Sequence, residues 1–386
     1  MTRKILFVSH SSELNGAERV LLGLLKRLDR AKFRPLLVVP RRGPVESEAR
    51  RAGVAVNVVN MKWWLTERSK AWKQLLSWAW NRAAARRIVR IIRDEGIDLV
   101  FTNSAAVCSG ALAAGRAGVP HIWSIHELLG ETPLLVSLFG RRRLVRDILR
   151  RSTRVIVNSR ATAGVFGRDG RVRLVYNGVD APSASPDSEA GLKKSLGLGP
   201  EDTVLGVVGK VYRDKGQEDV VRALPALRER YPQIRLLIVG GFRDRSSRST
   251  LDATVSENRL ENHVLYLGQR NDVPGLLRIM DLLVVASRID SFGLCVLEAM
   301  AAGTPVLALR AGGLPEIISH GKDGFLMDSA DAAGIRDAVV SALSSPSLAR
   351  IRDEAARTAA RFSLQRQVRE TEAVIREALK DADADC

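Results

Sequence analysis

Two carboxylates lie on either side of a glycine in the segment Asp290-Ser-Phe-Gly-Leu-Cys-Val-Leu-Glu298, which follows a short apolar run at 282–285. Such a run reads as a buried strand, and the residues after Gly293 read as a helix. The glycine would let the backbone approach a ligand, and a helix N-terminus offers unpaired N–H groups to a phosphate. The pattern favours a site for a phosphate-containing donor. A helix capped by Ser291, with Glu298 as a structural acid, is the alternative.

The eight-residue spacing of the two carboxylates matters for this interpretation. Asp290 and Glu298 would not share a helical face unless the helix starts between them. We therefore expect Asp290 in the loop and Glu298 on the helix, where the two groups can contact different parts of one ligand.

A second candidate segment, Gly209-Lys-Val-Tyr-Arg-Asp-Lys-Gly216, follows the apolar run 204–208. Its cations, Lys210 and Lys215, could neutralise a departing diphosphate, as cationic clamps do in other phosphate chemistry. Lysine lacks the bidentate fork of arginine, for which Arg213 could compensate. A basic surface loop is the alternative.

The first half of the chain offers three further polar positions. Gly16 opens a predicted helix, His126 and Glu127 follow an apolar run at 122–125, and His10 follows the first predicted strand as a weaker candidate. The alternatives are a helix-start glycine capped by Asn15 and structural, hydrogen-bonding histidines.

Short apolar runs alternate with longer amphipathic stretches along the chain, as expected for parallel sheets covered on both faces. The predicted strands are 5–8, 36–39, 54–59, 99–102, 122–125, 155–157, 204–208, 236–239, 264–267, 282–285 and 306–309. A Pro-, Ser- and Gly-rich stretch at 181–200 separates two such series. The sequence therefore predicts an α/β fold with two doubly wound domains, whose ligands bind beyond the carboxyl ends of the strands, in the cleft between the domains.

The ordered motifs resemble those of glycosyltransferase family 4, whose members are retaining enzymes of the GT-B fold. Glu298-Ala-Met-Ala-Ala-Gly-Thr-Pro-Val306 is similar to the family's central motif, and Ala311–Ile318, His320–Phe325 and Tyr176–Asp180 are similar to others. The resemblance covers nearly the whole chain. It implies two Rossmann-like domains facing each other across a cleft. The expected boundaries are 1–180 for the acceptor side, 181–200 for a linker, 201–363 for the nucleotide-sugar side and 364–386 for a C-terminal helix and tail.

The resemblance also implies roles for individual residues. Asp290 would contact the transferred sugar, His126 would face it across the cleft, and Glu298 would bind the ribose. The donor would further contact Gly16, Lys210, Lys215, Arg270 and the backbone of Phe292, Gly293, Leu294 and Cys295. Two departures stand out, because the family usually has Glu at position 290 and Arg at position 210. The donor would be a UDP- or GDP-sugar, with the leaving phosphate helping to deprotonate the acceptor.

The formal net charge of +17 is unevenly distributed along the chain. The first 173 residues hold 33 Lys and Arg against 13 Asp and Glu. Five of the six tryptophans lie among basic residues between Met61 and Arg93, a composition typical of interfacial membrane contact; they are Trp63, Trp64, Trp72, Trp78 and Trp80. We expect docking on an anionic membrane and a lipid-linked or envelope glycan acceptor. Tryptophans packed inside the domain and a merely well-solvated basic surface are the alternatives.

Other classes of protein fit the residues less well. Nucleic-acid binding would suit the charge but lacks a recognisable module, and a non-catalytic GT-B binding or partner protein and an epimerase are further alternatives. Cys108, Cys295 and Cys386 are too far apart to indicate a disulfide framework or a zinc site. We expect no metal or other cofactor, a disordered tail at 381–385, no transmembrane segment or signal peptide, and a cytoplasmic protein bound peripherally to the inner face of the cell membrane.

Overall fold

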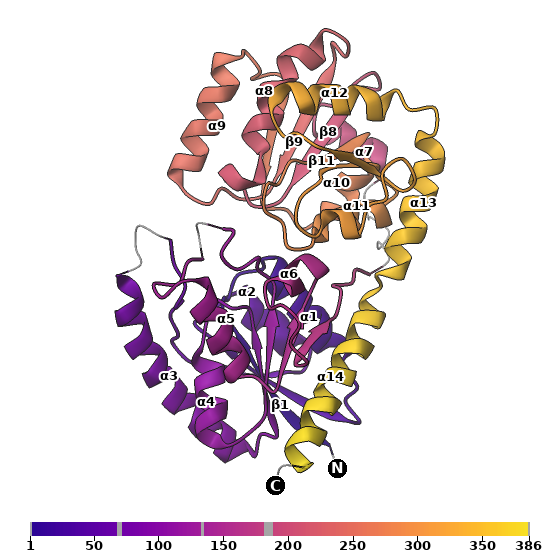
Figure 1. The fold of residues 1–386 in the computed structure, drawn as a ribbon. Coiled ribbons are helices and arrows are strands. Elements are labelled where there is room, and N and C mark those ends of the chain that lie inside the picture. Colours follow the sequence, from indigo (N-terminus) through magenta and orange to yellow (C-terminus); the bar gives the residue numbers. More distant parts are fainter. Residues whose placement is uncertain (1, 68–71, 133–134, 181–187, 385–386) are drawn as a thin grey trace. The chain divides into compact units, whose positions relative to one another are not determined.

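The computed structural model describes residues 2–67, 72–132, 135–180 and 188–384, which form two compact units. Unit 1 comprises 1–178 and 364–386, and unit 2 comprises 179–363. Within the predicted linker, 181–187 lie outside the described residues, and helix α7 (Glu189–Ser195) follows. Figure 1 shows each unit as a central sheet with helices around it.

Unit 1 contains a parallel seven-stranded sheet in the order β3-β2-β1-β4-β5-β6-β7. Its strands are β1 (Arg3–Ser9), β2 (Phe33–Val39), β3 (Ala55–Val58), β4 (Leu99–Asn103), β5 (His121–Ile125), β6 (Arg154–Val157) and β7 (Val172–Leu174). Its helices are α1 (Gly16–Arg27), α2 (Pro44–Arg51), α3 (Lys73–Glu95), α4 (Ser109–Ala117), α5 (Arg141–Arg150), α6 (Arg160–Gly164) and α14 (Leu364–Ala384).

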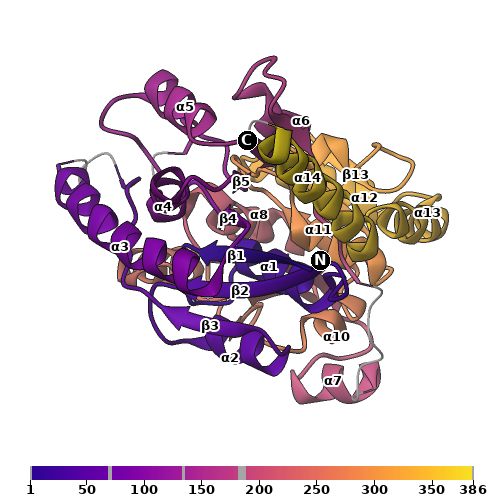
Figure 2. The same cartoon turned by 90° about the horizontal axis from the view of Figure 1, so that it is seen from below.

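The alternation of side chains along β1 explains the two layers of helices in unit 1. Successive residues of a strand point to opposite faces of the sheet. Ile5 and Phe7 join a core with α1, α2 and α14, whereas Leu6 and Val8 join a core with α3 and α4. Helix α14 lies beside α1, as both views show (Figure 1, Figure 2). The apolar runs predicted from the sequence are thus strands that are covered on both sides.

The prediction of a disordered tail at 381–385 is wrong for the residues that the structure describes. Helix α14 continues to Ala384, where Asp381 pairs with Arg154 and Asp383 pairs with Arg3 at 2.8 Å. In the sequence these acidic residues indicate a solvated tail. In the structure they pair with arginines of β1 and β6, which lie far away in the chain.

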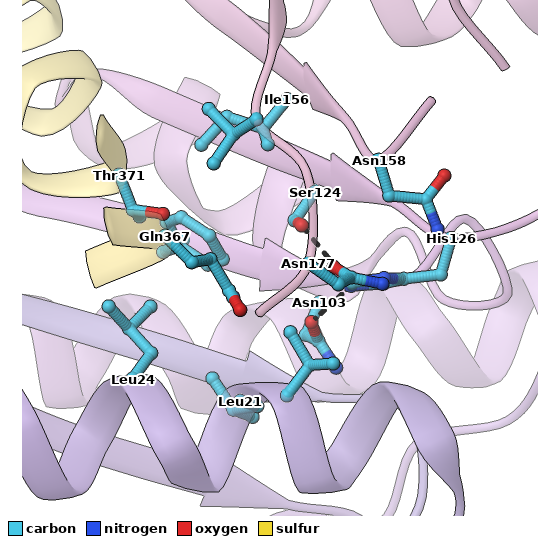
Figure 3. A pocket seen from close by; sticks show the side chains of 13 residues that line it. Leu21, Leu24, Asn103, Ser124, His126, Ile156, Asn158, Asn177, Gln367 and Thr371 are labelled. Atoms are coloured by element: carbon cyan, nitrogen blue, oxygen red, sulfur yellow. Dashed lines mark hydrogen bonds between the residues drawn. The ribbon is translucent and has the colours of Figure 1, made fainter. Parts of the chain in front are cut away.

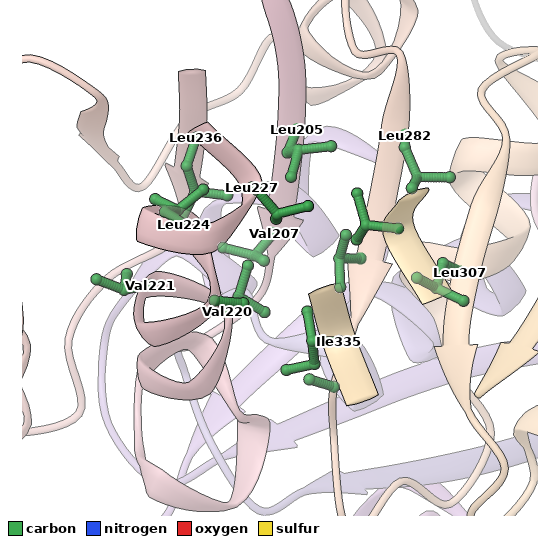
Figure 4. Close-up of a cluster of buried hydrophobic side chains, with 14 of the residues drawn as sticks. Leu205, Val207, Val220, Val221, Leu224, Leu227, Leu236, Leu282, Leu307 and Ile335 are labelled. Atoms are coloured by element: carbon green, nitrogen blue, oxygen red, sulfur yellow. The ribbon is translucent and has the colours of Figure 1, made fainter. Parts of the chain in front are cut away.

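Unit 2 contains a parallel six-stranded sheet in the order β10-β9-β8-β11-β12-β13. Its strands are β8 (Thr203–Val208), β9 (Ile234–Val239), β10 (Val264–Gly268), β11 (Leu282–Val285), β12 (Val306–Leu309) and β13 (Phe325–Met327). With α7, its helices are α8 (Gln217–Arg228), α9 (Arg245–Glu257), α10 (Val273–Arg278), α11 (Leu294–Ala301), α12 (Ala332–Leu343) and α13 (Leu348–Arg361), with 3₁₀ turns η2 (Arg213–Lys215) and η3 (Leu314–Glu316). One core lies between this sheet and α8, α9 and α12 (Figure 4).

Candidate functional site

The strand order of each sheet reverses direction at one point, and the side chains of interest gather there. In unit 2 this switch point lies between β8 and β11, and in unit 1 it lies between β1 and β4. Ligands of doubly wound sheets bind at such points, beyond the carboxyl ends of the strands. The loops that follow these four strands are therefore the places to look for chemistry.

In unit 2, the loops after β8 and β11 meet through a partly buried ion pair. Lys215 Nζ donates to Asp290 Oδ2 at 2.7 Å, and the two side chains are 25% and 11% exposed. Gly216 permits this close approach of the two loops, because its φ is 71° and a Cβ atom there would lie 2.4 Å from the Ala286 carbonyl oxygen. The structure thus joins two residues that are 75 positions apart in the sequence.

The Lys215 ammonium remains charged in this setting. Burial alone would lower its pKa, but Asp290 outweighs burial, and the net direction is a raised pKa. Asp290 Oδ1 meanwhile accepts a hydrogen bond from the Phe292 N–H at 3.2 Å. Since both carboxylate oxygens already accept hydrogen bonds, Asp290 is arranged to hold a ligand or a cation rather than to attack a carbon atom.

Helix α11 begins directly after this ion pair and has no side-chain cap. Its N-cap residue is Gly293, with φ of 91°, so the alternative of a cap by Ser291 is not what the structure contains. A Cβ atom on Gly293 would lie 2.4 Å from Leu314, and one on Gly313 would lie 2.3 Å from the Ser291 carbonyl oxygen. The first N–H groups of a helix lack intrahelical partners, so Leu294 and Cys295 present donors suited to an anion.

Cys295 and Glu298 extend the cluster along α11. Burial raises the pKa of the Cys295 thiol to about 12, and the nearby carboxylates of Asp290 and Glu298 act in the same direction, against Lys215. The thiol is therefore protonated at neutral pH and is no nucleophile. The helix does begin between Asp290 and Glu298, as predicted from their spacing.

Two predicted donor residues lie in the neighbouring loops rather than in this cluster. Lys210 is exposed, and its carbonyl accepts a hydrogen bond from Gln217 Nε2 at 3.2 Å. Arg270 follows β10 and pairs with Asp272 at 2.6 Å.

In unit 1, a hydrogen-bond chain determines the tautomer of His126. Asn103, at the end of β4, donates from Nδ2 to the Ala17 carbonyl at 3.2 Å, so its Oδ1 must accept. His126 Nε2 lies 2.9 Å from that oxygen and therefore carries the proton (Figure 3). Nδ1 keeps a lone pair, is buried and has no hydrogen-bond partner among the described residues. Burial also lowers the His126 pKa, which favours the neutral ring.

The cavity behind His126 is too small for a sugar. It is lined by polar side chains of Asn103, Ser124, Asn158, Asn177, Gln367 and Thr371 and by apolar residues of α1 (Figure 3). About 20 Å³ is open to the centre of a water molecule, which is room for about one water. We interpret it as a hydrated gap under His126 rather than as a substrate pocket.

A buried ion pair beside His126 was not predicted from the sequence, which offered only His10 as a weaker candidate. His10 Nδ1 lies 2.9 Å from Glu18 Oε1, and both side chains are almost fully buried. Burial opposes charge on each group, but the partner outweighs it, so the pKa of His10 is raised and that of Glu18 is lowered. The available signal in the sequence is Glu18 in the first turn of a helix that starts soon after the first strand.

Gly16 has open space beside its backbone, which a ligand would need in order to approach it. It is the first residue of α1, is exposed, and has no atom within 4 Å of the place where a Cβ would lie. Asn15 precedes it at the N-cap without a side-chain cap hydrogen bond. The open space at Gly16 could accept a ligand. The alternative of a helix-start glycine after Asn15 is found as well, but without a side-chain cap hydrogen bond.

Across the described residues there is no group of three or more His, Cys, Asp or Glu side chains able to hold a metal ion. Among the helices in that part of the chain, none combines the length and apolar character needed to cross a membrane.

Comparison with family models matches both units. Residues 14–182 match the model described as Glycosyltransferase Family 4, and residues 189–359 match the model described as Glycosyl transferases group 1. HepE from Anabaena, solved in complex with UDP and glucose, superposes with a TM-score of 0.82 at 25% identity, over 97% of this chain and 99% of HepE. Two Rossmann-like units and this likeness confirm the predicted GT-B fold.

Curated relatives point to the same family. The chain is 28% identical over 313 residues to the N-acetyl-alpha-D-glucosaminyl L-malate synthase of Bacillus anthracis, covering 78% of this chain and 80% of the relative. It is 32% identical over 282 residues to the GDP-mannose-dependent alpha-(1-6)-phosphatidylinositol monomannoside mannosyltransferase of Mycolicibacterium smegmatis, covering 68% and 71%. On its motifs, its fold and these matches, the chain is a glycosyltransferase and belongs to glycosyltransferase family 4.

Proposed function

We propose that this protein is a retaining glycosyltransferase that takes a sugar from a nucleoside-diphosphate sugar. The observation that carries the proposal is the Lys215–Asp290 pair at the switch point of unit 2, directly before the uncapped start of α11. A fixed cation and free helix N–H groups together match a diphosphate leaving group. The complexes of HepE with UDP and with UDP-glucose support a nucleotide-sugar donor.

In the proposed complex, each part of the donor has its own partner. The diphosphate binds at the start of α11 and is neutralised by Lys215 and by the exposed Lys210. Asp290 contacts hydroxyls of the transferred sugar, and Glu298 accepts from the ribose hydroxyls. Arg270, in the loop after β10, lies nearest the base. On unit 1, the neutral His126 contacts the transferred sugar.

The proposed reaction needs no enzyme nucleophile. The bond between the anomeric carbon and the phosphate oxygen breaks, the acceptor oxygen bonds to the same carbon on the same face, and the acceptor proton passes to the departing phosphate. The engagement of both Asp290 oxygens supports this front-face route over a covalent one. We propose that the two lysines and the helix terminus supply the positive charge, so transfer proceeds without a divalent cation.

We further propose a lipid-linked or envelope glycan acceptor, reached from an anionic membrane surface. Two observations support it. The M. smegmatis relative is named for a phosphatidylinositol monomannoside acceptor, and the basic, tryptophan-rich segment of unit 1 exposes large apolar side chains.

Thermal-shift measurements with UDP-, GDP- and ADP-sugars test the donor first, because a ligand bound to the native state raises the unfolding temperature. The sugar that stabilises the protein is then incubated with glycolipid extracts, with and without EDTA, and the anomeric configuration of the product is read by NMR. An α product from an α donor, unaffected by EDTA, is expected. Stabilisation without any transfer or hydrolysis would instead support a non-catalytic binding protein.

A further inference from the structure

Helix α3 is inverted over its first turns: its apolar side chains face solvent and its polar ones are buried. Leu75, Leu76, Trp78 and Trp80 are 62%, 61%, 47% and 52% exposed, whereas Gln74 and Asn81 are 7% and 0% exposed. The second half of the helix is ordinary, with Ala84, Ala85, Ile88, Val89 and Ile92 buried. An exposed apolar cluster of this kind marks an interaction site rather than a core.

The two buried polar side chains explain why the helix is turned this way. Gln74 donates from Nε2 to the Val136 carbonyl at 2.6 Å and accepts from the Leu138 N–H at 2.7 Å. Asn81, two turns later, donates to the Lys62 carbonyl at 2.7 Å and accepts from Ser109 Oγ at 2.7 Å. Both amides satisfy backbone groups of loops, so rolling the helix to bury its leucines would leave these groups unpaired.

The Gln74 contacts fasten a second apolar element beside α3. Leu138 and Phe139 are 43% and 56% exposed, and Trp72, just before the helix, is 62% exposed. We name this surface the apolar platform; its members are Trp72, Leu75, Leu76, Trp78, Trp80, Leu138 and Phe139. Helix α3 lies at the edge of unit 1 in both views (Figure 1, Figure 2).

The apolar platform carries cations on its aromatic rings. Arg82 lies 4.5 Å from the centroid of Trp78, and Arg143 lies 4.6 Å from that of Phe139. Lys73 and Trp72 form a similar pair at 5.4 Å. From Arg68 to Arg93 the sequence contains no Asp or Glu. Tryptophan with flanking Lys and Arg is the composition that binds the interface of an anionic bilayer.

Only some of the tryptophans between residues 61 and 93 pack inside the domain. Trp64 stacks on the buried Trp123 with centroids 6.0 Å apart, and its Nε1 donates to the Ala105 carbonyl at 2.6 Å. Trp72, Trp78 and Trp80 have no such burial. The alternative of tryptophans packed inside the domain therefore holds for Trp64, whereas Trp72, Trp78 and Trp80 are exposed and accessible to a partner.

We propose that the apolar platform is the surface that inserts into the interface of an anionic lipid bilayer, with two separate segments locked together by Gln74. This inference rests on the proposed function, because membrane binding would bring unit 1 to a lipid-linked acceptor. A second copy of the chain is a poorer occupant, because two surfaces this rich in cations and free of acids repel each other.

The test uses the full chain and sedimentation with vesicles of phosphatidylcholine, with and without phosphatidylglycerol. The unchanged protein binds the anionic vesicles, and salt weakens this binding. The double variant Leu75→Gln/Leu76→Gln keeps helix propensity and is expected to bind roughly tenfold or more weakly. Phe139→Ser, on the second segment, is expected to weaken binding as well. Leu174→Gln, an exposed leucine on β7, is the matched control and leaves binding unchanged.

Two results would overturn the proposal. Either the unchanged protein does not bind anionic vesicles, or the double variant binds them as strongly as the unchanged protein does. A dimer in light scattering that the double variant converts to a monomer would assign the platform to self-association. The same variants are measured for stabilisation by donor sugars. If the double variant no longer binds vesicles but is still stabilised by a donor sugar, the result supports membrane binding by the apolar platform. If the unchanged protein binds vesicles but no donor sugar, only the proposed function is contradicted.

Discussion

At the scale of single residues, Lys215 and Asp290 act as one unit, because each is the main partner of the other in a partly buried setting. We expect Lys215→Met to lower kcat by about 10²–10³, the usual loss when one preorganised charge is removed from a transition state. The double variant Lys215→Met/Asp290→Asn should lose less than the two single effects combined, because the residues are in direct contact.

Steady-state kinetics and donor thermal shifts check this prediction, with Lys194→Met, an exposed lysine on α7, as the control. Additive effects in the double variant, or a Lys215→Met protein with ordinary kcat, would show that the ion pair is only structural.

The protonation state of His126 depends on one neighbouring side chain, that of Asn103. Asn103→Asp would place a carboxylate 2.9 Å from His126 Nε2 and raise the histidine pKa. If the proposed contact of His126 with the sugar needs a neutral ring, activity is lost as the ring becomes protonated. The acid limb of kcat/KM should therefore move to higher pH by about one unit or more.

A pH–rate profile, together with an NMR titration of the histidines, measures this shift. Asn57→Asp, the same change on β3, should leave the profile where it is. An acid limb that does not move although the His126 pKa rises would remove His126 from the reaction.

Only part of the candidate site could be predicted from the sequence, because contacts between residues far apart in the chain leave no local pattern. The position of Asp290 before a helix and of Glu298 on it follows from local spacing. The Lys215–Asp290 pair could be guessed only from the family resemblance, because nothing local brings together residues 75 positions apart. The His10–Glu18 pair was not predicted for the same reason, since each residue alone looks like a structural polar group.

At the scale of elements, β5 is anchored by a histidine that must stay neutral. His121, its first residue, donates from Nδ1 to the Arg151 carbonyl at 2.9 Å and accepts from Thr102 Oγ1 at 2.8 Å. Burial is the main cause that lowers its pKa to about 3. Between that value and the usual value near 6.5, the unfolded chain binds a proton that the folded chain excludes.

Stability is therefore lost as the pH falls below about 6.5. The His121 contribution between pH 7 and pH 5 is roughly 2 kcal/mol, at about 1.4 kcal/mol per pH unit. Urea unfolding at both pH values measures it. We expect His121→Gln to be less stable at pH 7 and to lose about 2 kcal/mol less than the unchanged protein on going to pH 5. Equal losses in both proteins would contradict this account.

The elements that the sequence predicts well are those with continuous apolar runs. β1, β2, β4 and β8 are buried on both faces, so their runs have no polar interruptions. β7 and β13 were not predicted, because three residues are too few to show a pattern. The direction in which α3 faces also escapes local analysis, because it depends on Gln74 and Asn81 meeting loops that lie elsewhere in the chain.

At the scale of the whole molecule, the end of the chain completes the unit that its beginning starts. Helix α14 adds Leu364, Val368, Ile375 and Leu379 to the core of unit 1. Its Glu377 pairs with Arg154 at 3.1 Å and also with Arg173, and these cations lower the Glu377 pKa to about 2. Unit 2, residues 179–363, is therefore inserted between two parts of unit 1.

This arrangement predicts which strands lose stability when one residue of α14 is changed. Ile375 is fully buried, and Ile375→Asp should destabilise unit 1 by roughly 3 kcal/mol or more, because it creates a cavity and buries a carboxylate. Hydrogen exchange should then speed up in β1, β4 and β5, although these strands lie more than 200 residues earlier in the chain. The strands of unit 2, which are nearer in sequence, should keep their protection, because a unit with its own core opens independently. Arg369→Ser, on the exposed face of α14, controls for the helix itself. Faster exchange confined to α14, or spread equally over both units, would mean that the helix is not part of the unit 1 core.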